Sequence, residues 1–278
     1  MKIELHHEVS YGYWKDRELD LSREFMDEVR PIVGVSMLRL GRNFDGGYVV
    51  PRLALIECDA LISLGYGYDS SFEREFLKLN RKKSVNLYDS SINLQSSIKR
   101  LFLDLFSVIF RGRGFPVFRS KQLLEYLFVV FNQRINYKVG KIGHINDSKC
   151  LNLIDTLKAS AYKKIILKMD IEGSEYESLD LDLHYLGRFQ CLIIEFHDVE
   201  SRIDEFLTIT NNIKKDFALI NTHINNFAPI VNGIPQVIEL CFIRSSLIAN
   251  DSLKKAESIP HPNDLPCDPS KPEITYRY

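Results

Sequence analysis

The stretch that decides the fold is KIILKMDIEGSE, residues 164–175. Residues 164–170 are rich in apolar and β-branched side chains and predict a buried strand. Lys168, Asp170 and Glu172 follow one another at a spacing of two, so they would share one face if the chain stayed extended. Charged groups on a central strand are costly unless they lie at its exposed end. The stretch therefore predicts a strand that ends in a polar site.

Strands and helices alternate on both sides of this stretch. The other predicted strands are residues 60–65, 84–89, 137–145, 191–197, 217–224 and 236–244, and the predicted helices are residues 20–33, 70–80, 150–160 and 201–215. We expect the last two strands to form an antiparallel pair. The alternation is typical of a doubly wound, mostly parallel sheet, whose ligand crevice lies at the carboxyl ends of the strands.

The turn after the first of these strands is rich in glycine. Gly65 and Gly67 would let the backbone approach a ligand closely, and the helix that follows favours an anionic group. The pattern is GxG without the third glycine of a dinucleotide fingerprint, and no P-loop lysine follows. Asp89 ends the next strand, about 20 residues later, where an acid commonly accepts hydrogen bonds from ribose hydroxyls. A turn or cap role beside Ser90 is the alternative.

The predicted strand at 191–197 ends in Glu195 and His197, which should lie beside Asp170 and Glu172. Histidine is the natural proton shuttle near neutral pH. A satisfied strand-end side chain is the alternative for either residue alone. Because two neighbouring strands both end in acids, the pattern favours a catalytic site.

A second histidine, His223, lies in the string THINNF at residues 222–227. It is a second candidate base. The two asparagines after it could form hydrogen bonds with the hydroxyl groups of a ligand. An ordinary role in stabilising a turn is an equal alternative.

Several of these strings together resemble one known family. LKMDIEGSEYE at 167–177, followed by IIEFH at 193–197, resembles the FkbM family of S-adenosylmethionine-dependent methyltransferases. LGYGYDSSFEREF at 64–76 is similar to that family's nucleotide loop, and DGGYVV at 45–50 is similar to an element of a related subgroup. The chain departs from the pattern at Ser63, where many class I methyltransferases have an acid.

The resemblance implies a class I methyltransferase-like Rossmann fold with a mostly parallel seven-stranded sheet and an antiparallel last strand. It implies S-adenosyl-L-methionine as the cofactor. Gly65 and Gly67 would pack against its methionine portion, and Asp89 would bind its ribose. Asp45 and Tyr48 would close over it from the N-terminal side.

The resemblance also implies where the chemistry takes place. Asp170 would lie near the reacting centre, Glu172 near the cofactor amine or the acceptor, and His197 would be the candidate base. The sulfonium carbon is already activated, so the protein must align an acceptor oxygen and remove a proton, which Asp170 or His197 would take. A divalent ion held by Asp170, Glu172 or His197 is an alternative that the sequence does not favour.

The implied acceptor is a sugar hydroxyl or a phosphate-linked small molecule, in surface-polysaccharide (capsule or O-antigen) or natural-product biosynthesis. A nucleotide-sugar-binding oxidoreductase or epimerase is an alternative, although the missing third glycine and the lack of a Tyr-xxx-Lys pair count against it. A non-catalytic methyltransferase-fold scaffold is another, and the acids Asp89, Asp170 and Glu172 count against that one.

Composition narrows the class of protein. The 278 residues are 45% hydrophobic and 26% charged, and the net charge is −1, so no global field favours a nucleic-acid or membrane partner. The five cysteines are scattered without a CxxC pair, which argues against a disulfide framework or a structural zinc site. The sequence also lacks a signal-peptide pattern and a transmembrane stretch. We expect a cytoplasmic enzyme.

Three segments are expected along the chain. Residues 1–55 form an N-terminal extension that packs on the core, residues 56–250 the methyltransferase domain, and residues 251–278 a Pro-rich C-terminal extension. Residues 92–136 interrupt the alternation with seven Lys and Arg residues against two acids, and predict a helical insertion. It could be a lid, a clamp for a phosphate-bearing acceptor, or a contact with a membrane surface or subunit.

Overall fold

The computed structural model describes residues 21–79, 82–89, 117–142, 150–151, 153, 157, 161–179, 183–248 and 253–278. Residues 92–116 of the predicted insertion and most of the helix predicted at 150–160 lie outside the described residues. The remaining part of the insertion contains helix α5 (Val117–Phe131), as predicted.

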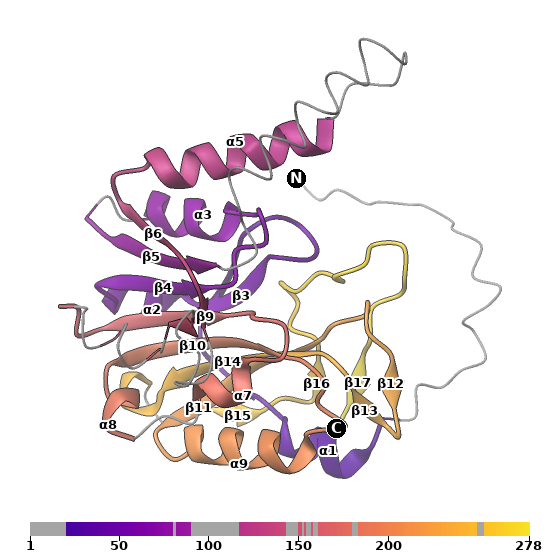
Figure 1. Ribbon diagram of the computed structural model, residues 1–278. Helices are drawn as coiled ribbons and strands as arrows, with labels where there is room; N and C mark the ends of the chain where they lie inside the picture. Colours follow the sequence, from indigo (N-terminus) through magenta and orange to yellow (C-terminus); the bar gives the residue numbers. More distant parts are fainter. Residues whose placement is uncertain are drawn as a thin grey trace, which may run out of the picture.

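A seven-stranded sheet forms the centre of the protein (Figure 1). Its strands are β4 (Ala60–Leu64), β5 (Ser84–Asp89), β6 (Ile135–Val139), β9 (Ile165–Met169), β10 (Phe189–Phe196), β11 (Phe217–Ile224) and β14 (Ile238–Arg244). The order across the sheet is β11-β14-β10-β9-β4-β5-β6. Neighbours from β10 to β6 pair in parallel, and β14 runs antiparallel to both β10 and β11. The expected Rossmann-like sheet with an antiparallel last strand is confirmed.

The bounds of most strands agree with the apolar runs in the sequence, because the central strands are covered on both faces. Every residue of β4, β9 and β10 is buried, which favours a continuous apolar run over alternation. The third predicted strand, 137–145, is displaced: β6 begins at Ile135 and ends at Val139.

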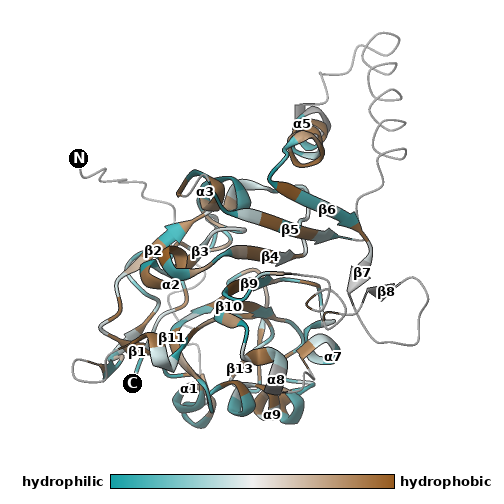
Figure 2. Ribbon diagram, turned by 90° about the vertical axis from the view of Figure 1, so that its left-hand side faces the viewer, coloured by the Kyte–Doolittle hydropathy of each residue, from teal (hydrophilic) through white to brown (hydrophobic). Residues whose placement is uncertain are grey.

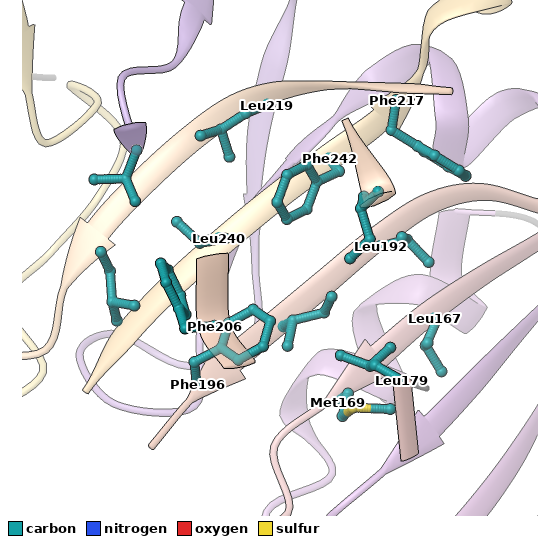
Figure 3. Packing of buried hydrophobic residues seen from close by; sticks show 14 of the residues in the cluster. Leu167, Met169, Leu179, Leu192, Phe196, Phe206, Phe217, Leu219, Leu240 and Phe242 are labelled. Atoms are coloured by element: carbon teal, nitrogen blue, oxygen red, sulfur yellow. The ribbon is translucent and has the colours of Figure 1, made fainter. Parts of the chain in front are cut away.

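Two hydrophobic clusters lie on opposite faces of the sheet. Ile165 and Leu167 of β9 belong to one cluster, while Ile166 between them belongs to the other, as expected of a pleated strand. The first cluster is covered by α1 (Arg23–Glu28), α7 (Glu175–Leu179), α8 (Leu183–Leu186) and α9 (Ile203–Ile213). Figure 3 shows side chains of β9, β10, β11 and β14 packing with Leu179 and Phe206 in this cluster.

The second face is covered by a hairpin and three helices. These are β2 (Met37–Leu40) with β3 (Tyr48–Pro51), α2 (Arg52–Glu57), α3 (Ser71–Leu79) and α5. In Figure 2 the central strands β4 and β10 are largely brown, in keeping with a sheet that is apolar on both faces. Among the described residues, no helix has the length and apolar character that a membrane crossing requires.

The chain from residue 253 to 278 packs beside β11. β15 (Lys254–Lys255) pairs with β1 (Ile32–Val33), and β16 (Ser258–Ile259) pairs with β17 (Tyr276–Arg277). Four minor strands, β7 (Lys141–Ile142), β8 (Cys150–Leu151), β12 (Ile230–Val231) and β13 (Ile234–Pro235), and the 3₁₀ turn η1 (Ser245–Leu247) complete the described elements. β1 also contacts β11, so the chain near each end of the described residues lies beside this strand.

Candidate active site

A cavity of about 740 Å³ lies at the carboxyl ends of β4, β5, β9 and β10. Its volume is within the usual range for small-molecule sites. Seven of the predicted site residues line it: Asp45, Gly65, Gly67, Asp89, Asp170, Glu172 and His197. Tyr48 and His223 are not among the lining residues. The cavity therefore lies where the alternation of strands and helices predicts a ligand crevice, at the carboxyl ends of the strands.

The two glycines after β4 have different surroundings. Gly65 has a φ of +82°, and a Cβ added there would lie 1.6 Å from the backbone oxygen of Asp170. Only glycine allows β4 and β9 to end this close together. Gly67 has a φ of +55°, and a Cβ added there would meet no atom within 4 Å. Gly65 is thus required for packing, whereas Gly67 borders open space in which a ligand could lie.

Asp89, at the end of β5, holds the glycine loop in place through hydrogen bonds to its backbone. Its Oδ2 accepts hydrogen bonds from the backbone N–H groups of Tyr66, at 2.7 Å, and Gly67, at 3.1 Å. The side chain is buried and also lines the cavity. Asp89 therefore couples the shape of the glycine loop to the position predicted to bind ribose.

Beneath the loop lies a buried polar group that the sequence analysis missed. Ser63, which stands where the resemblance places an acid, donates a hydrogen bond to Glu73 Oε1 at 2.6 Å. Glu73 is fully buried, and this burial raises the pKa of its carboxyl group. Lys168 Nζ donates to Gly65 O at 3.1 Å. The signal available in the sequence was an acid, Glu73, between two apolar residues of one helix face, Phe72 and Phe76.

Tyr48 links two acids near the part of the cavity that Asp170 and His197 line. Its hydroxyl lies 3.2 Å from Asp170 Oδ2 and 3.2 Å from Glu195 Oε2. It can donate to only one of them at a time. Burial, with the nearby charges of Asp170 and Glu239, raises the pKa of Glu195 well above its usual range. Tyr48 thus lies behind the cavity wall and holds two acidic side chains in place.

His197, which follows β10, faces the cavity with one ring nitrogen. Its Nδ1 lies 3.1 Å from Glu175 Oε1, and its Nε2 lies 3.5 Å from Glu172 Oε2 and 3.8 Å from Glu195 Oε1. Burial alone would lower the pKa of His197, but its hydrogen bond with Glu175 and the surrounding carboxylates raise it to about 9. An Nδ1–H that donates to Glu175 leaves Nε2 as the nitrogen that can exchange a proton with a ligand.

Glu175 is a second residue that the sequence analysis did not single out as part of the site. It is completely buried at the start of α7. Besides His197, its Oε1 accepts from the backbone N–H groups of Ile171, at 3.0 Å, and Gly173, at 3.3 Å. One carboxylate oxygen therefore fixes both the turn after β9 and the orientation of the histidine.

The expectation that Lys168, Asp170 and Glu172 share one extended face is wrong. Strand β9 ends at Met169, and Glu172 has a φ of +55°, so the chain turns before it reaches Glu172. The Glu172 side chain is 86% exposed and reaches His197 from the rim of the cavity. Its position comes from the turn that Glu175 holds.

His223, the second candidate base, has a different environment. It is 1% exposed, with Nδ1 3.0 Å from Glu239 Oε2 and Nε2 3.3 Å from Glu273 Oε2. Both ring nitrogens are thus engaged inside the protein. Since His223 does not line the cavity, an acceptor bound there would not contact it.

The loop before β3 forms the N-terminal wall of the cavity. Arg42 Nη2 pairs with Asp45 Oδ2 at 3.0 Å, and Arg42 Nε pairs with Asp69 Oδ2 at 2.9 Å. Arg42 N also donates to Ser71 Oγ at 2.8 Å, which fixes the loop on α3. Asp45 lines the cavity at this wall, and burial raises the pKa of its carboxyl group.

The cavity is strongly acidic, which favours a cationic ligand group. Its acidic lining residues are Asp45, Asp69, Asp89, Asp170, Glu172 and Glu195, and its lining lysine and arginine are Lys168 and Arg42. Asp170, Glu172 and His197 can each bring one ligand atom to within 4.8 Å of the others, so these three residues could hold a metal ion.

Comparison with known proteins gives no family. No protein-family model matches the chain, and no curated protein sequence matches it significantly. Similar solved structures include a fibrillarin/Nop5p complex, at 8% identity and a TM-score of 0.36, which covers 67% of this chain and 72% of that one. Human methyltransferase-like protein 13 in complex with SAH has 12% identity and a TM-score of 0.36, covering 72% of this chain and 76% of that one.

A third similar structure is an O-methyltransferase family protein from Burkholderia thailandensis, at 10% identity and a TM-score of 0.35. The match covers 69% of this chain and about half, 52%, of that protein. Identities this low, with TM-scores below 0.5, establish no common function.

Proposed function

We propose that the protein is an S-adenosylmethionine-dependent methyltransferase that acts on a hydroxyl group. The observation that carries this proposal is the convergence of two groups on one cavity. The glycine loop and Asp89 line one part of it, and Asp170 and His197 line another. A ligand in contact with both groups would be held at its nucleoside end and have its reactive end beside acids and a proton acceptor.

The residues present fit this cofactor. The open side of Gly67 gives a ligand access to the loop backbone, and Asp89 ends β5 where ribose hydroxyls are commonly bound. A sulfonium and an ammonium group are cationic, and the acidic lining of the cavity would stabilise them. The lack of a third glycine and of a P-loop lysine makes a dinucleotide or a nucleoside triphosphate a poorer fit.

When bound, the cofactor supplies an activated methyl group. The protein must then hold the acceptor oxygen in line with that group and take its proton. His197 is the residue best placed for this, because Glu175 fixes Nδ1–H and leaves Nε2 toward the cavity. Asp170 is the alternative base. Tyr48 would keep Asp170 and Glu195 oriented as the proton moves.

A sugar hydroxyl suits the walls of the cavity as the acceptor. Phe227 lines the cavity and is 54% exposed, so its ring offers an apolar surface on which a sugar ring could pack. Asn225, which also lines the cavity, is fixed by donating to Glu195 Oε1 at 3.0 Å. A role in surface-polysaccharide or natural-product biosynthesis is consistent with such an acceptor.

A test of this function has two steps. Thermal shift with S-adenosylmethionine, NAD and nucleotide sugars first identifies the class of ligand, and transfer of a labelled methyl group to a panel of free and phosphate-linked sugars then identifies the acceptor. We expect stabilisation by S-adenosylmethionine and labelling of a sugar. Stabilisation by NAD or a nucleotide sugar alone would instead support an oxidoreductase or epimerase, and cofactor binding without transfer to any acceptor would support a scaffold.

A further inference from the structure

We infer that the protein has a structural zinc site formed by His223, Glu239 and Cys267. Each offers one ligand atom, and the three atoms lie within 4.8 Å of one another. The residues come from β11, β14 and the C-terminal segment, which are distant in sequence. No CxxC pair is involved, so the spacing of the cysteines could not have predicted the site. The inference does not depend on the proposed methyl transfer.

The three side chains face one another in a closed environment. His223 is 1% exposed, Glu239 5% and Cys267 2%. His223 Nδ1 lies 3.0 Å from Glu239 Oε2, and Cys267 Sγ lies 3.3 Å from Glu239 Oε1. Ligand atoms of a tetrahedral zinc site lie about 3.3–3.6 Å apart, because Zn–N, Zn–O and Zn–S bonds are about 2.0–2.3 Å long. His223 and Cys267 each face a different oxygen of Glu239, so a bidentate Glu239 would supply the fourth ligand atom that a closed zinc site needs.

The other ring nitrogen of His223 has the partner that a metal ligand needs. Nε2 lies 3.3 Å from Glu273 Oε2. A metal-bound histidine usually donates its second N–H to a carboxylate, which fixes the tautomer and the ring orientation. With Nε2–H directed to Glu273, Nδ1 is left with a free lone pair on the side of Glu239.

The surrounding charges favour a cation at this position. Glu239 lies directly opposite Glu195 in the antiparallel pair of β14 and β10, and both are buried. Glu273 adds a third carboxylate, and His223 lies between Glu239 and Glu273. Buried charges in proteins are paired or coordinate a metal. A zinc ion would displace the thiol proton of Cys267 and any proton on His223 Nδ1 into solvent, and would offset part of this negative charge.

The site would attach the C-terminal segment to the sheet. Cys267 and Glu273 belong to that segment, and His223 and Glu239 belong to adjacent strands. The backbone oxygen of Cys267 accepts from Asp45 N at 3.3 Å, so the same attachment supports one wall of the cavity. Zinc here has a structural role, since none of the three ligands lines that cavity.

The test is metal analysis of the full chain, purified without chelators. We expect about one zinc per chain. The variants Cys267→Ser and His223→Gln should each weaken zinc binding by more than the roughly 10–100-fold typical of changes outside the ligand set. Cys58→Ser is the matched control, because Cys58 is also a buried free cysteine but contacts Leu55 O instead. It should keep its zinc.

Cobalt substitution tests the site even if those variants do not fold. Co²⁺ bound by the wild-type chain should show a thiolate-to-cobalt charge-transfer band, and Asp170→Asn should retain it because the Asp170, Glu172 and His197 group contains no sulfur. A folded wild-type chain that carries no zinc and gives no thiolate band would overturn the proposal. Zinc content unchanged in folded Cys267→Ser would overturn it as well.

Discussion

His197 and His223 lie near the carboxyl ends of β10 and β11, the strands on either side of β14. Their hydrogen-bond partners are similar, but their exposure to solvent differs. His197 follows β10 and has Nδ1 3.1 Å from a buried glutamate, Glu175. His223 lies in β11 and has Nδ1 3.0 Å from a buried glutamate, Glu239. The side chain of His197 is nevertheless 15% exposed, whereas that of His223 is 1% exposed.

The difference comes from what covers each strand end. Nε2 of His197 faces the cavity, 3.5 Å from Glu172 Oε2 and 3.8 Å from Glu195 Oε1. Nε2 of His223 is covered by the C-terminal segment through Glu273. A histidine at the carboxyl end of a strand is therefore available for chemistry only where no other segment packs on it.

The largest effect should come from removing His197. If it is the base, His197→Ala should slow methyl transfer by about 10²–10⁴-fold and leave cofactor affinity nearly unchanged. Single-turnover kinetics together with equilibrium binding would separate these quantities. Normal turnover in this variant would transfer the role of base to Asp170.

Removing His223 should affect stability instead. His223→Ala leaves Glu239 and Glu273 without their buried partner, so we expect a loss of about 3–5 kcal/mol in the free energy of unfolding. Urea denaturation would measure this loss. Turnover per folded molecule should change far less than in His197→Ala. The contrast between the two histidines fails if His223→Ala abolishes transfer while the protein keeps its stability.

A third change separates cofactor binding from proton transfer on the cavity side. Asp89→Ala removes charge-assisted hydrogen bonds and should weaken cofactor affinity by about 10–100-fold, or roughly 1.5–3 kcal/mol. Asp89→Asn is the matched control, since its amide oxygen can still accept from Tyr66 N and Gly67 N. If Asn restores the affinity fully, Asp89 acts by holding the loop; if it does not, the charge itself is needed.

The smallest effect concerns the pH at which His197 changes its charge. A base must be neutral to accept a proton, so kcat/KM should rise with pH through about 9, the raised pKa of His197. Glu175→Gln removes the charge that raises this pKa and should move the rise toward lower pH, with maximal turnover retained. The same raised pKa stabilises the fold at low pH, an effect that is lost as pH rises through about 9. A pH profile unchanged by Glu175→Gln would contradict the role given to Glu175.

The fold followed from the sequence because apolar runs and glycine turns are local signals. Residues 84–89 and 217–224 form strands with the predicted bounds, and the predicted antiparallel pair is present. The position of the cavity could be predicted because the carboxyl ends of the parallel strands could be recognised in the sequence. What could not be predicted depends on contacts between distant segments. No pattern near His223 shows that Glu273 and Cys267 cover it, and no pattern near Ser63 shows that Glu73 reaches back to it.

The most direct test of the central claim is calorimetric titration of the protein with S-adenosylhomocysteine, with and without magnesium. We predict binding of micromolar affinity that falls by about tenfold or more in Asp89→Ala and is unchanged in His223→Gln once corrected for the folded fraction. Absence of binding to the folded wild-type protein in either condition, where NAD or a nucleotide sugar does bind, would contradict the assignment of this cavity to a methyl donor.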